Sequence, residues 1–246
     1  NKKGIPSFAS ILNSGMKAID ASDFEQLVDE SGALILDTRN ASDFSKGFVP
    51  QSINIGISGD FAPWVGALIA DVNQPIVLVT DSGKEEETVT RLSRVGFDSV
   101  LGHLKGGFET WKNNDQVIDM LILVEPDELA MDIPFDEFLM PLDIREETAF
   151  NTSHIKNSVS LPLSEFMDPG SMSELDEHFN IYIISEDGSS NTLAASILKK
   201  QGIHNIRVVM DGWEGVQFLK DKFSFESIKK AKITKTDPNK TTFLED

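Results

Sequence analysis

The amino-acid sequence predicts an α/β fold of two domains, each with a doubly wound, mostly parallel central sheet and helices on both faces. Two observations predict this fold: a long internal repeat, and short apolar segments that alternate with helical ones. The segment Leu-Asp-Thr-Arg that starts at Leu36 returns as Leu-Asp-Ile-Arg at Leu142, 106 residues later. A repeat of that length indicates a duplicated domain rather than a solenoid.

The repeat continues along both copies and gives the expected domain boundaries. Residues 50–55 correspond to 156–161, and Gly83, Gly96 and Gly106 correspond to Gly188, Gly202 and Gly212. We therefore expect an N-terminal extension or linker at 1–16, a first domain at 17–115, a linker at 116–124, a second domain at 125–225 and a polar C-terminal tail at 226–246.

Apolar runs rich in β-branched residues predict the strands. In the first copy they are 33–36, 76–79 and a strand that opens at Val100; in the second copy they are 181–184 and 206–209. Such runs, apolar throughout and separated by helices, are typical of parallel strands buried on both faces.

Helical segments lie between these strands. We expect helices at 22–30 and 85–95 in the first copy and at 192–201 in the second. Ser22, with Glu25 three residues later, predicts a capping box at the start of the first helix. Glu125-Pro126-Asp127 marks the beginning of the second copy.

Composition excludes several classes of function. The 40 Asp and Glu against 22 Lys and Arg give a net charge of −18, which disfavours nucleic acids and anionic membranes as partners and free anions as substrates. The chain has no cysteine, so disulfides and thiolate metal sites are excluded. No run approaches the roughly 20 apolar residues of a membrane span. We expect a cytoplasmic protein that binds neither nucleic acid nor membrane.

Several motifs together resemble the rhodanese domain, a sulfurtransferase domain whose chemistry depends on one cysteine thiolate. They are the strand-end Asp37-x-Arg39, Asp43-Phe44, Pro50-x-Ser52-Ile53-Asn54 and the closing Gly-Gly-Phe-Glu-x-Trp of residues 106–111. The second copy repeats them more loosely, with His154-Ile155 and a closing Asp211-Gly212-Trp213. The resemblance covers residues 17–225 and implies two tandem rhodanese-like domains.

A narrower resemblance rests on the segments 61–68 and 85–92. They look like the first rhodanese-like domain of proteins in which a metallo-β-lactamase-fold domain, often a persulfide dioxygenase, precedes one or two rhodanese domains. The chain is then similar to the C-terminal half of such a fusion protein. Its four histidines are scattered, with no group at ligand spacing, so we expect no metal site and no cofactor.

In an active rhodanese domain a six-residue loop follows the central strand, begins with the nucleophilic Cys and often ends with Arg. The resemblance places Thr80 and Ser185 at the Cys positions, and Glu85 and Ser190 at the Arg positions. The two degenerate loops are Thr80, Asp81, Ser82, Gly83, Lys84 and Glu85, and Ser185, Glu186, Asp187, Gly188, Ser189 and Ser190.

Neither loop contains the groups that sulfur transfer needs. A hydroxyl cannot carry a stable persulfide, and no histidine or other base is placed to activate it. A carboxylate about 4 Å from a bound anion repels it by about 4 kcal/mol at an effective dielectric near 20. We therefore expect no catalytic residue. The resemblance also implies that Asp37 with Arg39, and Asp143 with Arg145, are structural ion pairs.

These observations leave three functional classes. The leading one is a catalytically inactive tandem module with an accessory or scaffolding role, joined to a metallo-β-lactamase-fold domain or a protein partner of sulfur metabolism, with a homo-oligomer as a further possibility. The second is a fragment that belongs to a sulfurtransferase or hydrolase family by descent. The third is a module that binds an anion or small ligand in the emptied loops.

Overall fold

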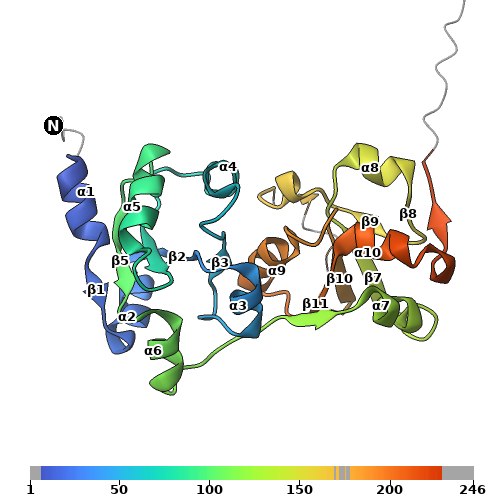
Figure 1. Cartoon of the computed structure of the whole chain (residues 1–246), viewed down its shortest axis with the longest axis horizontal. Coiled ribbons are helices and arrows are strands. Elements are labelled where there is room, and N and C mark those ends of the chain that lie inside the picture. Colours follow the sequence, from blue (N-terminus) through green and yellow to red (C-terminus); the bar gives the residue numbers. More distant parts are fainter. Residues whose placement is uncertain (1–6, 169, 172–174, 176–177, 229–246) are drawn as a thin grey trace, which may run out of the picture.

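The structure is a computed structural model that describes residues 7–168, 170–171, 175 and 178–228. Figure 1 shows two α/β domains side by side along the longest axis of the molecule. Within the described part of the chain, no helix combines the length and the apolar character that crossing a bilayer requires. The predicted fold class is confirmed: each domain has a parallel sheet between helices.

The first domain is built on a five-stranded sheet in the order β1-β5-β4-β2-β3. Its strands are β1 (Ala18–Ile19), β2 (Leu34–Asp37), β3 (Ile53–Asn54), β4 (Ile76–Val79) and β5 (Val100–Leu104). Every pairing among them is parallel. The central strands β2 and β4 are buried along their whole length, as their continuous apolar sequences predict.

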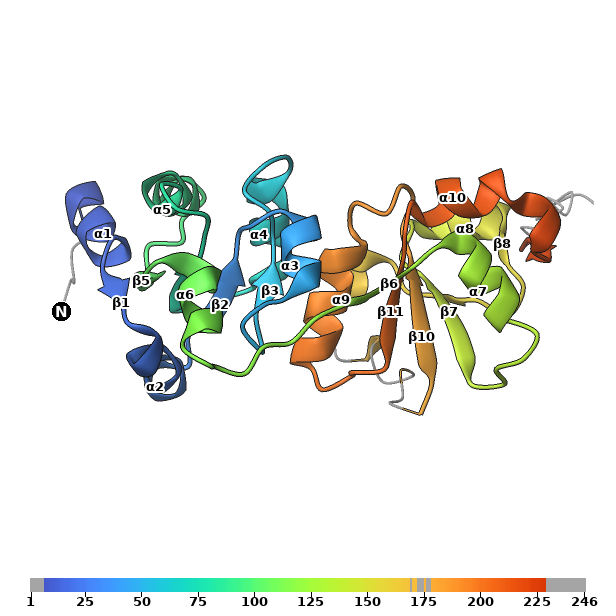
Figure 2. The same cartoon turned by 60° about the horizontal axis from the view of Figure 1, so that its bottom comes forward.

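Helices cover both faces of this sheet. They are α1 (Phe8–Gly15), α2 (Ala21–Ser31), α3 (Ala41–Lys46), α4 (Phe61–Leu68), α5 (Glu85–Arg94) and α6 (Gly107–Asn113). Side chains of α1, α4 and α5 pack with alternate residues of β2 and β4 in one apolar cluster. Side chains of α2 and α6 pack against the opposite face in a second cluster, and Figure 2 shows these helices on opposite sides of the sheet.

The second domain repeats the same strand order, β6-β11-β10-β7-β9, with parallel pairing. Its strands are β6 (Ile122–Val124), β7 (Leu139–Asp143), β9 (Val159–Ser160), β10 (Asn180–Ile184) and β11 (Ile206–Val209). A separate antiparallel pair joins β8 (His154–Ile155) to β12 (Phe225–Glu226). The duplication inferred from the sequence thus reappears strand by strand.

The helices of the second domain divide in the same way. They are α7 (Pro126–Asp132), α8 (Glu147–Thr152), α9 (Asn191–Lys200) and α10 (Gly212–Phe218), with 3-10 turns at Leu163–Glu165 and Lys220–Lys222. Side chains of α7 and α10 pack on one face of the sheet, and α9 covers the other. Figure 2 places α9 between this sheet and the first domain.

Three details differ from the sequence-based expectations. The capping box at Ser22 is wrong: α2 begins at Ala21 with Asp20 as its N-cap, and the Ser22 hydroxyl donates to the Asp23 carboxylate. A capping box forms instead between Glu125 and Glu128 at the start of α7. The expected N-terminal extension contains the helix α1, and the last three residues of the expected linker form the strand β6. Most of the expected C-terminal tail, 229–246, lies outside the described residues.

The two domains share one apolar core. A single cluster of buried side chains runs from α1, α4 and α5 of the first domain to α9 and the sheet of the second. At the interface the Asn54 backbone N–H donates to Ser196 Oγ (3.0 Å), and Lys199 Nζ donates to Asp119 Oδ1 (2.7 Å). Helix α9 is therefore the element through which the second domain contacts β3 and α3 of the first.

Candidate functional site

A buried ion pair closes the carboxyl end of β2. Asp37 accepts hydrogen bonds from Arg39 Nε at 3.0 and 3.1 Å, from Arg39 Nη2 at 2.6 Å and from the Arg39 backbone N–H at 3.0 Å. Arg39 Nη2 also donates to the Gly47 carbonyl oxygen at 2.9 Å. The pair therefore ties the end of β2 to the end of α3.

The second domain has the same arrangement at the end of β7. Asp143 accepts from Arg145 Nε at 2.9 and 3.1 Å and from Nη2 at 2.7 Å, and Nη2 donates to the Ser153 carbonyl oxygen at 2.8 Å. Ser153 lies eight residues after Arg145, as Gly47 does after Arg39. We call these two arrangements the strand-end clamps.

Each clamp arginine also faces an aromatic ring. The guanidinium carbon of Arg39 lies 4.3 Å from the Phe108 ring centroid, and that of Arg145 lies 3.8 Å from the Trp213 centroid. A desolvated cation is stabilised by such a ring. Burial raises the pKa of the Asp37 carboxyl, and the hydrogen bonds and charge of Arg39 oppose that rise. Carboxylate, carbonyl oxygen and ring together fix each arginine in place.

The first of the two loops follows β4 directly. Thr80 is buried, and its hydroxyl donates to the Asp81 carbonyl oxygen at 2.9 Å. The same carbonyl oxygen accepts from the Lys84 backbone N–H at 3.0 Å, which turns the chain into α5. The Lys84 ammonium donates to Glu87 on the first turns of α5, at 2.9 Å. The Thr80 hydroxyl and the Lys84 ammonium are thus directed to neighbours within about one helical turn along the chain.

The second loop follows β10 in the same way but has a different hydrogen bond. Ser185 is buried, and its Oγ accepts from the Gly188 backbone N–H at 3.0 Å. The glycines of both loops have the same left-handed backbone, with φ +83° at Gly83 and φ +81° at Gly188. The loops therefore share a backbone turn, while the strand-end hydroxyl donates in one loop and accepts in the other.

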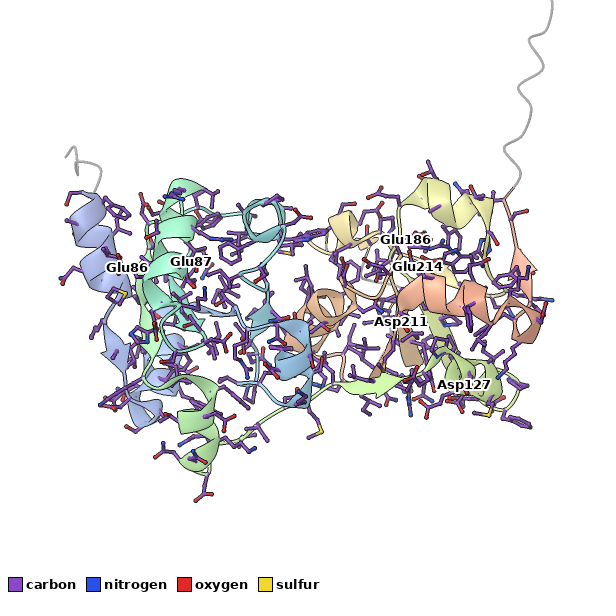
Figure 3. The ribbon with its side chains drawn as sticks, in the orientation of Figure 1. Glu86, Glu87, Asp127, Glu186, Asp211 and Glu214 are labelled. Atoms are coloured by element: carbon purple, nitrogen blue, oxygen red, sulfur yellow. The ribbon has the colours of Figure 1, made fainter. Side chains whose placement is uncertain are left out.

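Carboxylates surround the second loop. Arg145 Nη1 lies 3.9 Å from the Glu186 carboxylate, and the Glu214 backbone N–H donates to the Glu186 carbonyl oxygen at 3.0 Å. Figure 3 shows Glu186, Asp211 and Glu214 near one another at the start of α10. Hydrogen bonds from Ser189 hold the pKa of the Asp187 carboxyl below its usual range, so the carboxyl is ionised at neutral pH. An anion that entered this loop would meet several negative charges.

The closing glycines hold the two loops against the next helix. A side chain at Gly107, which has φ +65°, would come 2.9 Å from the Thr80 carbonyl oxygen, and one at Gly212 would collide with the Ser185 carbonyl oxygen. In the second domain the Trp213 backbone N–H donates to that Ser185 oxygen at 2.7 Å. Glycine is needed here because the backbone of α6 or α10 approaches the loop so closely.

Within the described residues, neither the Thr80 nor the Ser185 hydroxyl is hydrogen-bonded to a histidine or carboxylate side chain. His154 is buried, stacks on Phe150 and donates from Nδ1 to the Phe150 carbonyl oxygen at 2.8 Å. His103 Nδ1 lies 3.4 Å from the Leu104 carbonyl oxygen at the end of β5. Across the same described ranges, no group of three or more His, Asp or Glu residues is arranged to hold a metal ion.

A cavity of about 440 Å³ lies between the two domains, beside both loops. Asp81 and Lys84 of the first loop and Ser189 and Ser190 of the second contribute to its wall, whereas Thr80 and Ser185 do not. The remaining wall is Thr38, Asn40, Ala41, residues 54–61, Trp64 and Leu193. We call it the interdomain cavity.

Sequence reasoning did not predict this cavity, although four candidate site residues of the two loops, Asp81, Lys84, Ser189 and Ser190, lie in its wall. The β3–α4 segment, which includes Asp60, and the N-terminal part of α9 are more than a hundred residues apart in the chain. No local motif marks their approach, because packing of α9 on β3 produces it.

Fold and loops define a class of protein: a tandem of α/β domains, each with a short loop between a buried central strand and the next helix. The chain belongs to the rhodanese-like family. The family described as "Rhodanese-like domain" matches residues 20–114 and again residues 125–218. The predicted tandem of rhodanese-like domains is thereby confirmed.

Individual relatives resemble part of the chain. It is 31% identical over 121 residues to the putative sulfur carrier protein YrkF of Bacillus subtilis, across 47% of this chain and 62% of that protein. It is 33% identical over 101 residues to the uncharacterized protein YibN of Escherichia coli, across 41% of this chain and 70% of that protein. A thiosulfate sulfurtransferase structure from Pseudomonas aeruginosa shares 16% identity and a TM-score of 0.39, over 87% of this chain and 44% of that one.

Proposed function

We propose that this chain is a catalytically inactive tandem rhodanese-like module, an accessory or scaffolding part of a sulfur-metabolism protein. One observation carries the proposal. The strand-end positions expected for the nucleophile hold Thr80 and Ser185, in a chain without cysteine. A sulfane sulfur is carried as a persulfide on a thiolate, and this chain has no thiol to form one.

The hydroxyls at these positions are not activated for other chemistry. A serine or threonine becomes a nucleophile when an adjacent base removes its proton. The Thr80 hydroxyl instead donates to the Asp81 carbonyl oxygen, and Ser185 Oγ accepts from the Gly188 N–H. Both hydroxyls therefore stabilise the turn of their own loop, which supports a structural role.

Charge at the loops argues against a bound anionic substrate. A helix N-terminus offers about half a positive charge to an anion. Glu85, Glu86 and Glu87 lie in the first turn of α5, and Figure 3 shows Glu86 and Glu87 on that helix. Glu186 and Asp187 lie within the second loop. Because two or more full negative charges outweigh half a positive one, thiosulfate is expected to bind weakly.

The partner is proposed to be a metallo-β-lactamase-fold domain of sulfur metabolism, either fused to this chain or separate. The segments 61–68 and 85–92 support this through their similarity to such fusion proteins. In the structure, 61–68 is the whole of α4 and 85–92 is α5 without its last two residues, and both helices pack on the same face of the first sheet. Co-purification of the chain with such a protein would support the proposal, and a partner outside sulfur metabolism would contradict it.

A thiosulfate:cyanide assay with the purified chain tests the inactivity. We expect thiocyanate formation at the uncatalysed rate, and turnover above that rate would overturn the proposal. The double variant Thr80→Cys with Glu85→Arg, and the matched variant Ser185→Cys with Ser190→Arg, restore the thiol and the guanidinium in each loop. Gain of activity in either would show that the loop backbone still supports the chemistry and that the side chains alone are deficient.

A further inference from the structure

The interdomain cavity has the dimensions of a small-molecule site. Its volume of about 440 Å³ is within the roughly 300–1,000 Å³ typical of ligand pockets. The first domain contributes the end of β2, the β3–α4 segment and α4, and the second contributes the start of α9. Figure 2 shows β3 and α4 on the side of the first domain that faces α9. A molecule in this cavity would contact both domains at once.

One buried polar group at the cavity wall has no partner. Thr38 is 2% exposed, and its hydroxyl makes no hydrogen bond in the described structure. A buried hydroxyl left unpaired is costly, so such groups usually have a partner. The equivalent residue of the second domain is Ile144, whose backbone N–H makes the same kind of strand-end bond as that of Thr38. The fold therefore does not require a hydroxyl at this position, and a ligand would account for it.

The charged groups of the cavity are mainly negative. Asp60 and Asp81 are exposed carboxylates, and neither has an ion-pair or hydrogen-bond partner for its side chain among the described residues. Lys84, the cation of the wall, donates to Glu87 outside it. Two unpaired carboxylates at one cavity favour a positively charged ligand.

Aromatic side chains supply an apolar surface beside these carboxylates. Trp64 is partly buried and packs against the shared core, and Phe61, also on α4, is buried within that core. Leu193 of α9 lies on the wall from the second domain. An indole ring is the best aromatic partner for an organic cation. Carboxylates next to a tryptophan fit a ligand with an amine at one end and an apolar body at the other.

We propose that the interdomain cavity binds a small organic amine in its ammonium form. The ammonium group binds Asp60 and Asp81, a polar atom of the ligand pairs with the Thr38 hydroxyl, and the apolar body packs on Trp64 and Leu193. This inference goes beyond the inactivity of the loops and does not depend on it, since neither Thr80 nor Ser185 lines the cavity.

An anion fits the same wall poorly. Ser189 and Ser190 lie at the start of α9, where a helix dipole contributes about half a positive charge. Asp60 and Asp81 contribute two full negative charges, and the whole chain carries −18. The sum favours an ammonium over a carboxylate or a sulfur oxyanion.

Three probes of similar shape and different charge test the proposal: phenethylamine, 2-phenylethanol and phenylacetate, each titrated into the whole chain by calorimetry. We expect phenethylamine to bind about tenfold more tightly than the alcohol, and phenylacetate to bind more weakly than both. Equal affinity for all three, tighter binding of phenylacetate, or no binding of phenethylamine at millimolar concentration would overturn the proposal.

Variants locate the binding within the cavity. The double variant Asp60→Asn with Asp81→Asn should weaken phenethylamine binding about tenfold. Thr38→Val should leave it nearly unchanged, because phenethylamine has no second polar atom for the Thr38 hydroxyl. The matched control, Asp127→Asn with Glu137→Gln, removes two charges from the α7 region of the second domain and should leave the affinity unchanged. If the control weakens binding as much as the cavity variant, the effect is one of net charge and the site assignment is wrong.

Hydrogen exchange provides a readout that does not depend on the heat of binding. Because the cavity has walls from both domains, phenethylamine should slow amide exchange in residues 55–61 and also in residues 188–193. Circular dichroism of each variant verifies that it is folded. Protection of one domain alone, or of segments away from the cavity, would contradict a site between the domains.

Discussion

The two domains of this chain agree closely at one place and differ at another. The strand-end clamps have the same donors, the same acceptors and nearly the same distances, with the closest contact at 2.6 Å for Arg39 and 2.7 Å for Arg145. The loops after β4 and β10 share a left-handed glycine but differ in side chains and hydrogen bonds. A duplicated fold has thus retained its buried ion pair while its loop chemistry has diverged.

The difference shows which constraint acts on each part. An arginine or aspartate left alone in the interior would be a buried unpaired charge, so the clamp can change only as a unit. Most loop residues are exposed and can change singly, because water replaces any partner they lose, and the buried hydroxyls of Thr80 and Ser185 bond only within their own loop. The loops could therefore lose the groups needed for sulfur transfer without loss of the fold.

The strand next to each clamp, β3 or β9, is a third region, less similar between the domains than the clamps themselves. Asn54 on β3 donates from Nδ2 to the carbonyl oxygens of Asp37 and Arg39, at 3.1 and 3.0 Å. Ser160 is its counterpart on β9, and its hydroxyl is buried without a partner in the described structure. The clamp of the first domain is thus supported from the neighbouring strand, and that of the second domain lacks this side-chain support.

The largest expected effect comes from breaking a clamp. Arg39→Ala and Arg145→Ala each leave a buried carboxylate without its cation, and should lower the free energy of unfolding by about 3–5 kcal/mol. Denaturant unfolding followed by circular dichroism measures it. Similar losses in the two variants would confirm that the clamps are equivalent, and a difference of more than about 2 kcal/mol would break the comparison.

The strand-neighbour support should have an intermediate effect. Asn54→Ser removes both hydrogen bonds to buried carbonyl oxygens and should cost about 2 kcal/mol, within the range for unsatisfied buried groups. Ser160→Ala removes a hydroxyl that has no partner and should be neutral or slightly stabilising. Thermal unfolding of both variants checks this, and a marked loss of stability in Ser160→Ala would show that its hydroxyl does have a role.

The interdomain ion pair should have a smaller effect. Lys199 on α9 contacts Asp119 at 2.7 Å and lies 6.0 Å from the Phe48 ring centroid. Lys199→Met keeps the apolar stem and should cost about 1 kcal/mol, as for a partly exposed pair. Lys199→Met in combination with Asp119→Asn forms a double-mutant cycle with the single variants. A coupling energy near zero would mean that this ion pair contributes nothing measurable to the contact between the domains.

The smallest effect concerns the start of α5, which has three glutamates where α9 has no acidic residue in its first turn. A hydrogen bond from Lys84 holds the pKa of the Glu87 carboxyl below its usual range. A lowered pKa stabilises the folded state above the unfolded value, and this contribution is lost as the pH falls through the folded value. Thermal melts should therefore show that Glu87→Gln costs stability at neutral pH and little in acid, with Glu86→Gln as the control.

Much of the fold followed from local sequence. The apolar runs at 76–79 and 181–184 are central strands because a segment apolar on both sides must be buried on both faces. The strands β1 and β3 have two residues each, too few to show any sequence periodicity. They form because the backbone of the neighbouring strand, β5 or β2, provides hydrogen-bond partners. The N-cap of α2 is Asp20 rather than the predicted Ser22, and errors of one or two residues are common at helix ends.

The site was predictable only in part. The loop residues were identified because strand, glycine and helix follow one another in the chain. Thr38 and Asp60 were not identified, since nothing in the sequence near either residue signals that α9 lies opposite. Contacts between residues far apart in the chain depend on how the domains pack, and that packing is decided by the whole apolar surface of α9.

The shared apolar core of the two domains has a consequence for how the protein would respond to a protease. Residues 115–118 connect the halves and include the exposed Val117, so a cut there would meet little obstruction. The two fragments would nevertheless stay together, because separation would expose the buried face of α9 and the side chains it covers on the first domain. Each half is a repeat in sequence, but the stable physical unit is the pair.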